Sequence, residues 1–260
     1  MESRRIGRRE LLGLLGSGVV GAGLLACGDE PAIVVSTPTP APVATLSSTP
    51  RPATTATVTA ALTVTPQGEV PLLRVIDKDR GGLARDYVPS DLVRIEDRWA
   101  VPGFAGQTMR AEAAAVLVRL LDAADKSGTE LRVRSTFRSY GEQVGTFQFW
   151  VDRLGEAQAK RLSAPAGHSE HQLGTTADIS SRNINWELLT SFGDLPEGKW
   201  VDAHAHEFGF AISYPRNGEA VTGYMYEPWH IRYIGTARAA EWKRSGMILV
   251  KFLEQLNVPR

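Results

Sequence analysis

The chain has 260 residues, enough for one large domain or two small ones. Its 29 Lys and Arg residues balance 29 Asp and Glu residues, so the formal net charge is zero. This disfavours a broad basic face for nucleic acid, and we expect no nucleic-acid partner. With Cys27 as its single cysteine, the chain has no means of forming an intrachain disulfide.

The N-terminus has the layout of an export signal. Four arginines stand among the first nine residues, and an apolar, glycine-rich run from 11 to 26 follows. Leu24-Leu-Ala-Cys27 is typical of a lipobox, so we predict a lipoprotein signal peptide over residues 1–27 with a lipidated Cys27. An uncleaved membrane anchor is the alternative. Arg8-Arg9 leaves open whether export follows the twin-arginine or the general route.

Residues 28–69 are mostly Thr, Pro, Ala, Ser and Val, with hardly any charge and no aromatic side chain. Such a composition buries too little apolar surface to offset chain entropy, so we predict a disordered tether. The protein would then be an extracytoplasmic lipoprotein, held at the cell envelope by its N-terminal lipid anchor.

Residues 70–260 are predicted to form one domain. In its first half we expect an apolar first strand or leading segment over 72–76, irregular structure over 77–102, a helix over 108–126 and a strand over 131–134. A helical stretch over 140–162 should break near Gly155 and stop before Pro165.

The second half alternates short strands with helices. We expect strands over 176–179, 210–214 and 227–233, a helix over 200–208, and one or two closing helices over 236–255. The fold class is therefore α+β: a single compact domain with a small central antiparallel sheet flanked by helices.

Two residues in the middle of the domain could bind a metal. His171 and Asp178 lie seven apart, and Asp178 sits on a predicted strand between apolar Ala177 and Ile179. A carboxylate on that strand would face the core or a cavity, which is costly unless it is paired or bound to a metal. A satisfied polar loop explains the same spacing.

A second candidate group is Glu227-Pro-Trp-His230. In a regular strand Glu227 and His230 would point to opposite sides, but Pro228 favours a bend that brings them to one side. An exposed glutamate beside a core histidine is the alternative. We interpret His204 and His206 as surface or packing residues and His168 as a neighbour of the loop that carries His171.

These motifs together resemble the VanY-type D-alanyl-D-alanine carboxypeptidases. The resemblance is carried by Ser169-x-His171-(x6)-Asp178, by Glu227-Pro-Trp-His230, and by Arg138-Ser-Tyr-Gly-Glu-Gln143. Phe208-Gly-Phe210, Tyr214-Pro215 and Thr222-Gly-Tyr224 complete a match over about 131–235. Thr175-Thr176 stands where members often carry small or apolar residues.

The resemblance implies one zinc ion per chain, held by His171, Asp178 and His230. It implies Glu227 as the catalytic base and Arg138 as the contact for the substrate carboxylate or the developing oxyanion. The positions that match substrate-binding residues are Ser169, Gln143, Tyr214 and Trp229.

We therefore expect a zinc metallopeptidase that removes the C-terminal D-alanine from peptidoglycan stem peptides in the cell wall. An L,D-carboxypeptidase or a dipeptidase of the same family is an alternative. A non-catalytic cell-wall-binding lipoprotein is a third, which the presence of Glu227 beside all three ligand candidates disfavours. We expect a monomer.

Overall fold

A four-stranded antiparallel sheet in the order β3–β4–β6–β5 organises the part of the chain that the computed structural model describes, residues 72–78 and 82–256. These residues fall within one unit of the chain. The strands of the sheet are β3 (Arg132–Ser135), β4 (Thr176–Ser180), β5 (Phe210–Ile212) and β6 (His230–Tyr233). A second, two-stranded sheet pairs β1 (Leu92–Arg94) with β2 (Thr108–Arg110).

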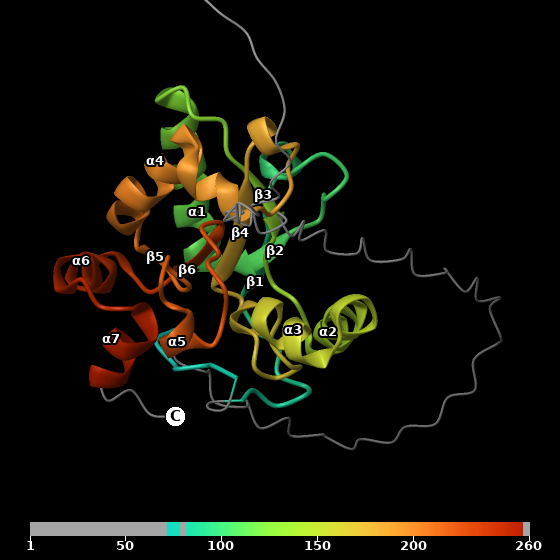
Figure 1. The fold of residues 1–260 in the computed structure, drawn as a ribbon. Coiled ribbons are helices and arrows are strands. Elements are labelled where there is room, and N and C mark those ends of the chain that lie inside the picture. Colours follow the sequence, from blue (N-terminus) through green and yellow to red (C-terminus); the bar gives the residue numbers. More distant parts are fainter. Residues whose placement is uncertain (1–71, 79–81, 257–260) are drawn as a thin grey trace, which may run out of the picture. The chain divides into compact units, whose positions relative to one another are not determined.

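Helices surround the larger sheet (Figure 1). They are α1 (Ala111–Lys126), α2 (Tyr140–Leu154), α3 (Glu156–Leu162), α4 (Pro196–His204), α5 (Glu219–Thr222), α6 (Thr236–Ser245) and α7 (Leu249–Gln255). Short 3₁₀ turns join them, among them one over Glu170–Leu173. Helix α6 lies beside the edge strand β5. Helices α2 and α3 pack against each other and lie away from that edge. This mixed helix and sheet arrangement confirms the predicted α+β class.

The two faces of the sheet differ in chemistry because side chains alternate along each strand. Val133, Ala177, Ile179 and Ile231 face the main core, where they pack with the apolar stripe of α1. On β4 and β6 the intervening positions are polar, namely Thr176, Asp178, His230 and Arg232. All four are buried, so loops and helices on that face must satisfy them.

Strand register places three polar residues side by side. Ser135 on β3 pairs with Asp178 on β4, which pairs with His230 on β6. The β3–β4 ladder shifts between Val133 and Ser135. This β-bulge adds one residue to β3 and thereby brings Ser135, rather than Arg134, opposite Asp178.

Helix α2 begins directly after the loop that carries Arg138. Ser139 and Glu142 form a capping box: the Ser139 hydroxyl accepts from the Glu142 amide, and the Glu142 carboxylate accepts from the Ser139 amide at 2.8 Å. Gly155, at φ +78°, separates α2 from α3 as predicted. The first turn of α2 is thus fixed, and with it the positions of Arg138 and Gln143.

Several predicted elements have different bounds. The segment 72–76 forms no strand, although Val75 and Ile76 are buried. Residues 108–110 form β2 instead of the first turn of α1, because they pair with 92–94. Helix α4 begins at Pro196, whose fixed φ and missing N–H suit a first helical position. Strand β6 begins only at His230, since residues 227–229 form a turn.

Gly198 in α4 offers a test of the packing. Alanine normally stabilises a helix interior relative to glycine by about 0.5–1 kcal/mol. At Gly198, however, a Cβ would overlap the backbone carbonyl of Phe192. We expect Gly198→Ala to lower the free energy of unfolding by about 1–3 kcal/mol, measured by urea denaturation. Gly145→Ala in α2 is the control, because its Cβ would meet open space. Equal stability of the two variants would contradict this packing.

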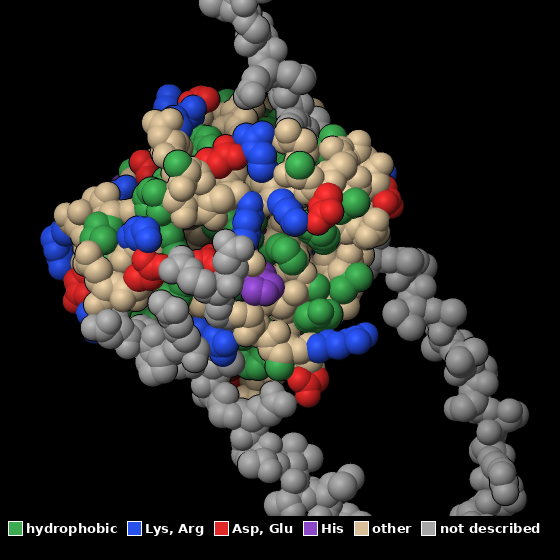
Figure 2. Space-filling view, turned by 60° about the horizontal axis from the view of Figure 1, so that its bottom comes forward, with side chains coloured by type: hydrophobic (Ala, Val, Ile, Leu, Met, Phe, Trp, Pro, Cys, Tyr) green, Lys and Arg blue, Asp and Glu red, His purple; other side chains and the backbone are tan. Residues whose placement is uncertain are grey.

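Basic, acidic and hydrophobic side chains are interspersed on the face shown in Figure 2, in keeping with the zero net charge. Among the described residues, no helix is both long and apolar enough to cross a membrane. The predicted signal peptide, Cys27 and the tether over 28–69 lie outside the described residues, so they stay predictions.

Candidate metal and catalytic site

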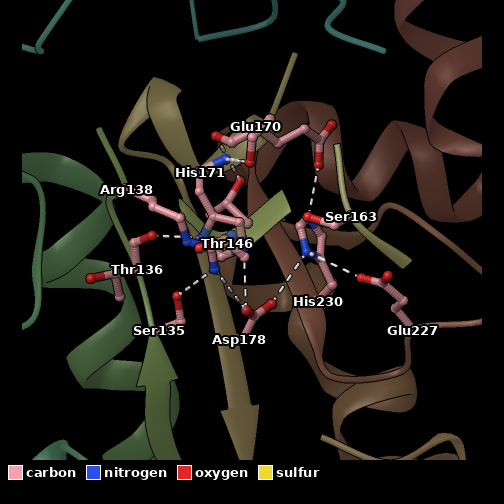
Figure 3. Close-up of polar contacts among 12 residues, drawn as sticks. Ser135, Thr136, Arg138, Thr146, Ser163, Glu170, His171, Asp178, Glu227 and His230 are labelled. Carbon is pink, nitrogen blue, oxygen red and sulfur yellow. Dashed lines mark hydrogen bonds and ion pairs between the residues drawn. The ribbon is translucent and has the colours of Figure 1, made fainter. Parts of the chain in front are cut away.

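The three predicted metal ligands meet on the polar face of the sheet. His171 Nε2 lies 3.2 Å from Asp178 Oδ2, and His230 Nδ1 lies 3.2 Å from Asp178 Oδ1. One ligand atom from each residue can be chosen so that all lie within 4.8 Å of one another. Figure 3 shows Asp178 between the two imidazoles, with Arg138 on the side of His171 and Glu227 on the side of His230.

Each imidazole is held by its other ring nitrogen. His171 Nδ1 lies 2.6 Å from the Thr136 carbonyl oxygen, and His230 Nε2 lies 3.0 Å from Glu170 Oε2. Both partners are acceptors, so these nitrogens carry the protons. When the imidazoles are neutral, the lone pairs are on His171 Nε2 and His230 Nδ1, the two nitrogens that face Asp178. Such outer hydrogen bonds fix the tautomer and ring orientation of metal-binding histidines.

The donor set fits a zinc ion. Two ligands about 2.0–2.1 Å from a tetrahedral zinc lie roughly 3.3 Å apart. Each imidazole nitrogen lies at a similar distance, 3.2 Å, from one Asp178 oxygen, with Oδ2 facing His171 and Oδ1 facing His230. One ligand atom from each of the three residues lies within 4.8 Å of the other two. In addition, Asp178 Oδ1 is buried and has no well-aligned hydrogen-bond partner among the described residues. Two imidazoles and one carboxylate leave a fourth position open, as in catalytic zinc sites.

Electrostatics keep Asp178 and His171 in the charge states that metal binding requires. Burial alone would raise the pKa of Asp178, but the facing imidazoles of His171 and His230 hold that pKa well below its usual range. Burial lowers the pKa of His171, which favours the neutral, metal-binding imidazole. The Asp178 carboxylate is therefore ionised and His171 is neutral near pH 7. At His230 burial alone would lower the pKa, but the carboxylates of Asp178 and Glu170 raise that pKa to about 10, so a metal must displace a proton from His230 when it binds.

Glu227 lies beside the ligand set, at the start of the turn that leads into β6. The His230 amide donates to the Glu227 carbonyl at 3.2 Å, which closes the turn and brings Glu227 Oε2 to 3.6 Å from His230 Nδ1. The predicted bend is thus present. Burial raises the pKa of Glu227 to about 8, and nearby Asp178 contributes to the rise. A neighbouring divalent cation would lower this pKa toward neutrality, the range of a general base.

Arg138 approaches Asp178 from the opposite side. Its Nη2 lies 3.9 Å from Asp178 Oδ2 and donates to Ser135 Oγ at 3.0 Å, while Nη1 donates to Gln143 Oε1 at 2.9 Å. Gln143 is itself fixed, because its Nε2 donates to Ser163 Oγ and to the Ala164 carbonyl. The guanidinium is therefore held in one orientation before any substrate binds.

A small cavity of about 50 Å³ adjoins these groups. All four predicted substrate-binding residues line it, namely Ser169, Gln143, Tyr214 and Trp229. The Tyr214 ring lies 4.7 Å from the His230 ring, and the Ser169 hydroxyl accepts from the His171 amide at 3.3 Å. The structure thus brings every predicted site residue of the folded domain to one place, although their roles stay predictions.

The other histidines have separate surroundings. His168 Nδ1 lies 2.7 Å from the Asp77 carbonyl oxygen. His204 is 43% exposed at its side chain and lies 3.2 Å from a Glu207 oxygen, and its ring lies 5.0 Å from that of Trp200. These contacts agree with the interpretation of His204 as a surface and packing residue.

Sequence reasoning missed the groups that support the ligands. Glu170 is 5% exposed and accepts from His230, Ser213 and Arg232. Burial alone would raise its pKa, but Arg232, His230 and Ser213 lower it to about 2. A glutamate next to a motif histidine carries no signal of burial. Arg232 does carry one, because it stands two residues after His230 on a predicted strand and so shares its face.

Comparisons with known proteins identify the family of this chain. A family model described as VanY, D-alanyl-D-alanine carboxypeptidase, matches residues 106–236. YodJ of Bacillus subtilis strain 168, a protein named as a carboxypeptidase, is 39% identical over 194 residues, which cover 74% of this chain and 71% of YodJ.

Two solved structures are also similar. The LdcB LD-carboxypeptidase, described in terms of peptidoglycan recognition, has a TM-score of 0.63 at 39% identity, over 70% of this chain and 86% of that chain. A mutant of the vancomycin-resistance D,D-pentapeptidase VanY in complex with Zn(II) has a TM-score of 0.58 at 26% identity, over 70% of this chain and 99% of that chain. Motifs, fold and relatives together show that this chain belongs to the VanY family of D-alanyl-D-alanine carboxypeptidases, which are peptidases.

Proposed function

We propose that the protein is a zinc-dependent carboxypeptidase that removes the C-terminal D-alanine from peptidoglycan stem peptides. The observation that carries the proposal is the position of Glu227, a buried carboxylate within 3.6 Å of a ligand nitrogen but outside the ligand set itself. The Zn(II) complex of a family member at 26% identity supports the choice of metal.

His171, Asp178 and His230 would hold the zinc ion. When bound, the ion would supply a Lewis acid that lowers the pKa of water and polarises the scissile carbonyl. The chain's own residues would do the remaining work. Glu227 would accept a proton from the attacking water and later deliver it to the leaving amine.

Arg138 is the second group that the chain contributes. Its guanidinium would donate hydrogen bonds either to the charge that develops on the carbonyl oxygen or to the terminal carboxylate of the substrate. Because Gln143 and Ser135 fix the guanidinium in advance, little reorganisation is needed when that charge appears.

The cavity at the site suits a small terminal residue. Its volume is about 50 Å³, and its apolar walls include Trp150, Leu162, Leu188 and Trp229. The other lining residues are mostly polar, and a methyl side chain is the kind of group that the apolar part of such a small space accepts. This supports alanine as the residue released.

A second candidate differs in the bond that is cut. The 39% identity with an LD-carboxypeptidase supports release of D-alanine from a tetrapeptide stem, where the preceding residue is an L-centre. Dipeptidase action is a further possibility within the family. A non-catalytic wall-binding role is disfavoured because Glu227, Arg138 and all three ligand candidates are present and converge.

We further propose that a lipid on Cys27 anchors the protein outside the cytoplasm and that residues 28–69 let the domain reach the peptidoglycan. A tether of 42 residues with proline-rich composition can extend over tens of ångströms, on the order of 3 Å per residue. We propose that the domain acts as a monomer, with stem peptides as its partners.

The test is mass spectrometry of stem peptides after incubation with the full chain in detergent. We expect loss of one C-terminal alanine from a pentapeptide, a tetrapeptide or both, and the product pattern identifies the bond. A zinc chelator should abolish the release, and added zinc should restore it. Full activity after the chelator has removed all bound metal would contradict the proposal.

A further inference from the structure

A buried arginine connects the N-terminal segment of the domain to the candidate metal site. Arg232 lies on β6 two residues after His230, and it is fully buried at 0% exposure. Its Nη1 donates to Glu170 Oε1 at 2.7 Å. Its Nη2 donates to two backbone carbonyls, those of Leu72 at 2.9 Å and Arg74 at 2.6 Å. The guanidinium thus bridges a carboxylate and a chain segment about 160 residues away in the sequence.

Glu170 passes this contact on to a ligand candidate. Its Oε1 accepts from Arg232, whereas its Oε2 accepts from Ser213 at 2.6 Å and lies 3.0 Å from His230 Nε2. With one oxygen fixed by Arg232, the other is aimed at His230. The imidazole of His230 then presents Nδ1 toward Asp178.

Helix, strand and loop elements thus converge on one buried network. The backbone of Leu72 and Arg74 orients the Arg232 guanidinium, which orients the Glu170 carboxylate, which orients His230. A buried carboxylate that loses its cationic partner is left uncompensated, which is strongly unfavourable, so Glu170 would not keep its position without Arg232. None of these contacts involves a ligand atom that would bind the metal.

We propose that Arg232, held by the backbone of residues 72–74, is a positioning residue for the metal site and sets the affinity for zinc through Glu170 and His230. The proposal rests on the proposed function, because it assumes that His230 is a zinc ligand. Loss of an outer partner of a metal-binding histidine weakens metal affinity by about 10–100-fold. We expect this effect although Arg232 itself does not touch the metal.

A purely structural role is the competing explanation. In that case, Arg232 would only attach the segment 72–76 to the sheet. Its substitution would lower the free energy of unfolding but leave the zinc affinity of the folded protein unchanged. Zinc affinity of folded protein therefore separates the two roles.

The experiment measures the zinc dissociation constant of the full chain by competition with a chromogenic chelator. Thermal unfolding of the metal-free proteins confirms that each variant is folded at the assay temperature. We expect Arg232→Met to raise the dissociation constant about 10–100-fold. Arg232→Lys keeps a cation for Glu170 but cannot reach both carbonyls as well, so we expect a smaller increase. If the Met variant does not fold, the Lys variant carries the test.

Arg132→Met is the matched control. Arg132 is a partly buried arginine in the same sheet, but its partners are Asp125 and Glu130, at 3.0 and 3.6 Å. Its substitution should leave the zinc dissociation constant within about twofold, the scatter of independent sites.

A double-mutant cycle tests the route through Glu170. Glu170→Gln alone should weaken zinc binding, and adding Arg232→Met to it should change the dissociation constant by no more than about twofold. Effects that multiply in the double variant would overturn the proposed route. Wild-type affinity in folded Arg232→Met, or in folded Arg232→Lys where only that variant folds, would overturn the proposal itself and leave the proposed function intact. A wild-type chain that binds no zinc would overturn both.

Discussion

Glu227→Gln is expected to lower kcat for D-alanine release by about 10²–10⁴-fold while leaving zinc binding intact. Glutamine has nearly the same shape as glutamate but cannot accept a proton from water at neutral pH. Glu227 is not among the three ligand candidates, although its Oε2 lies 3.6 Å from His230 Nδ1. The substitution therefore removes the proton acceptor and leaves the ligand set complete.

The measurement pairs steady-state kinetics on a stem peptide with zinc content per chain. Glu207→Gln is the control, since Glu207 is an exposed glutamate on the 3₁₀ turn after α4, where it contacts His204. It should keep wild-type kcat and zinc content. An active Glu227→Gln protein would refute the assignment of the base while leaving the fold and the metal site untouched.

Arg138→Lys is expected to lower kcat/KM by about 10²–10³-fold, the usual cost of losing one donor to a developing oxyanion. Lysine keeps the positive charge but loses the planar pair of donors. In the structure these donors are oriented by Gln143 and Ser135, which a lysine ammonium could not contact in the same way. Zinc content should stay at the wild-type level, because Arg138 is not a ligand candidate.

The kinetic pattern also shows what Arg138 contacts. A loss mainly in kcat indicates a contact made in the transition state, whereas a loss mainly in KM indicates binding of the terminal carboxylate. Arg182→Lys is the control, since Arg182 is an exposed arginine paired with Glu130. Wild-type kcat/KM in Arg138→Lys would remove Arg138 from the reaction.

The chemistry of the site could be predicted because it is concentrated in short motifs. His171, Asp178 and His230 fall within two of the motifs that carry the resemblance, and the strand period put Asp178 on the same face as Ser180. The helix α1 and the break at Gly155 were predicted for a similar reason, since apolar spacing and glycine act locally. Each of these signals needs only a few neighbouring residues.

The groups that support the site depend on contacts between distant segments. Glu170 is an ordinary polar residue until Arg232 and Ser213, more than 40 residues away, surround it. The bulge at Arg134, which aligns Ser135 with Asp178, arises from strand pairing and leaves no local pattern. Residues 108–110 were predicted as the first turn of a helix but form strand β2. Their partner strand lies 16 residues earlier, so local apolar spacing does not reveal the pairing.

Zinc K-edge X-ray absorption on the zinc-loaded full chain tests the central claim most directly, that two imidazoles and one carboxylate hold a single catalytic ion. The expected spectrum has two imidazole ligands and two oxygen ligands at about 2.0–2.2 Å from one tetrahedral zinc. A shell with no imidazole contribution, or one that contains the Cys27 sulfur, would contradict it.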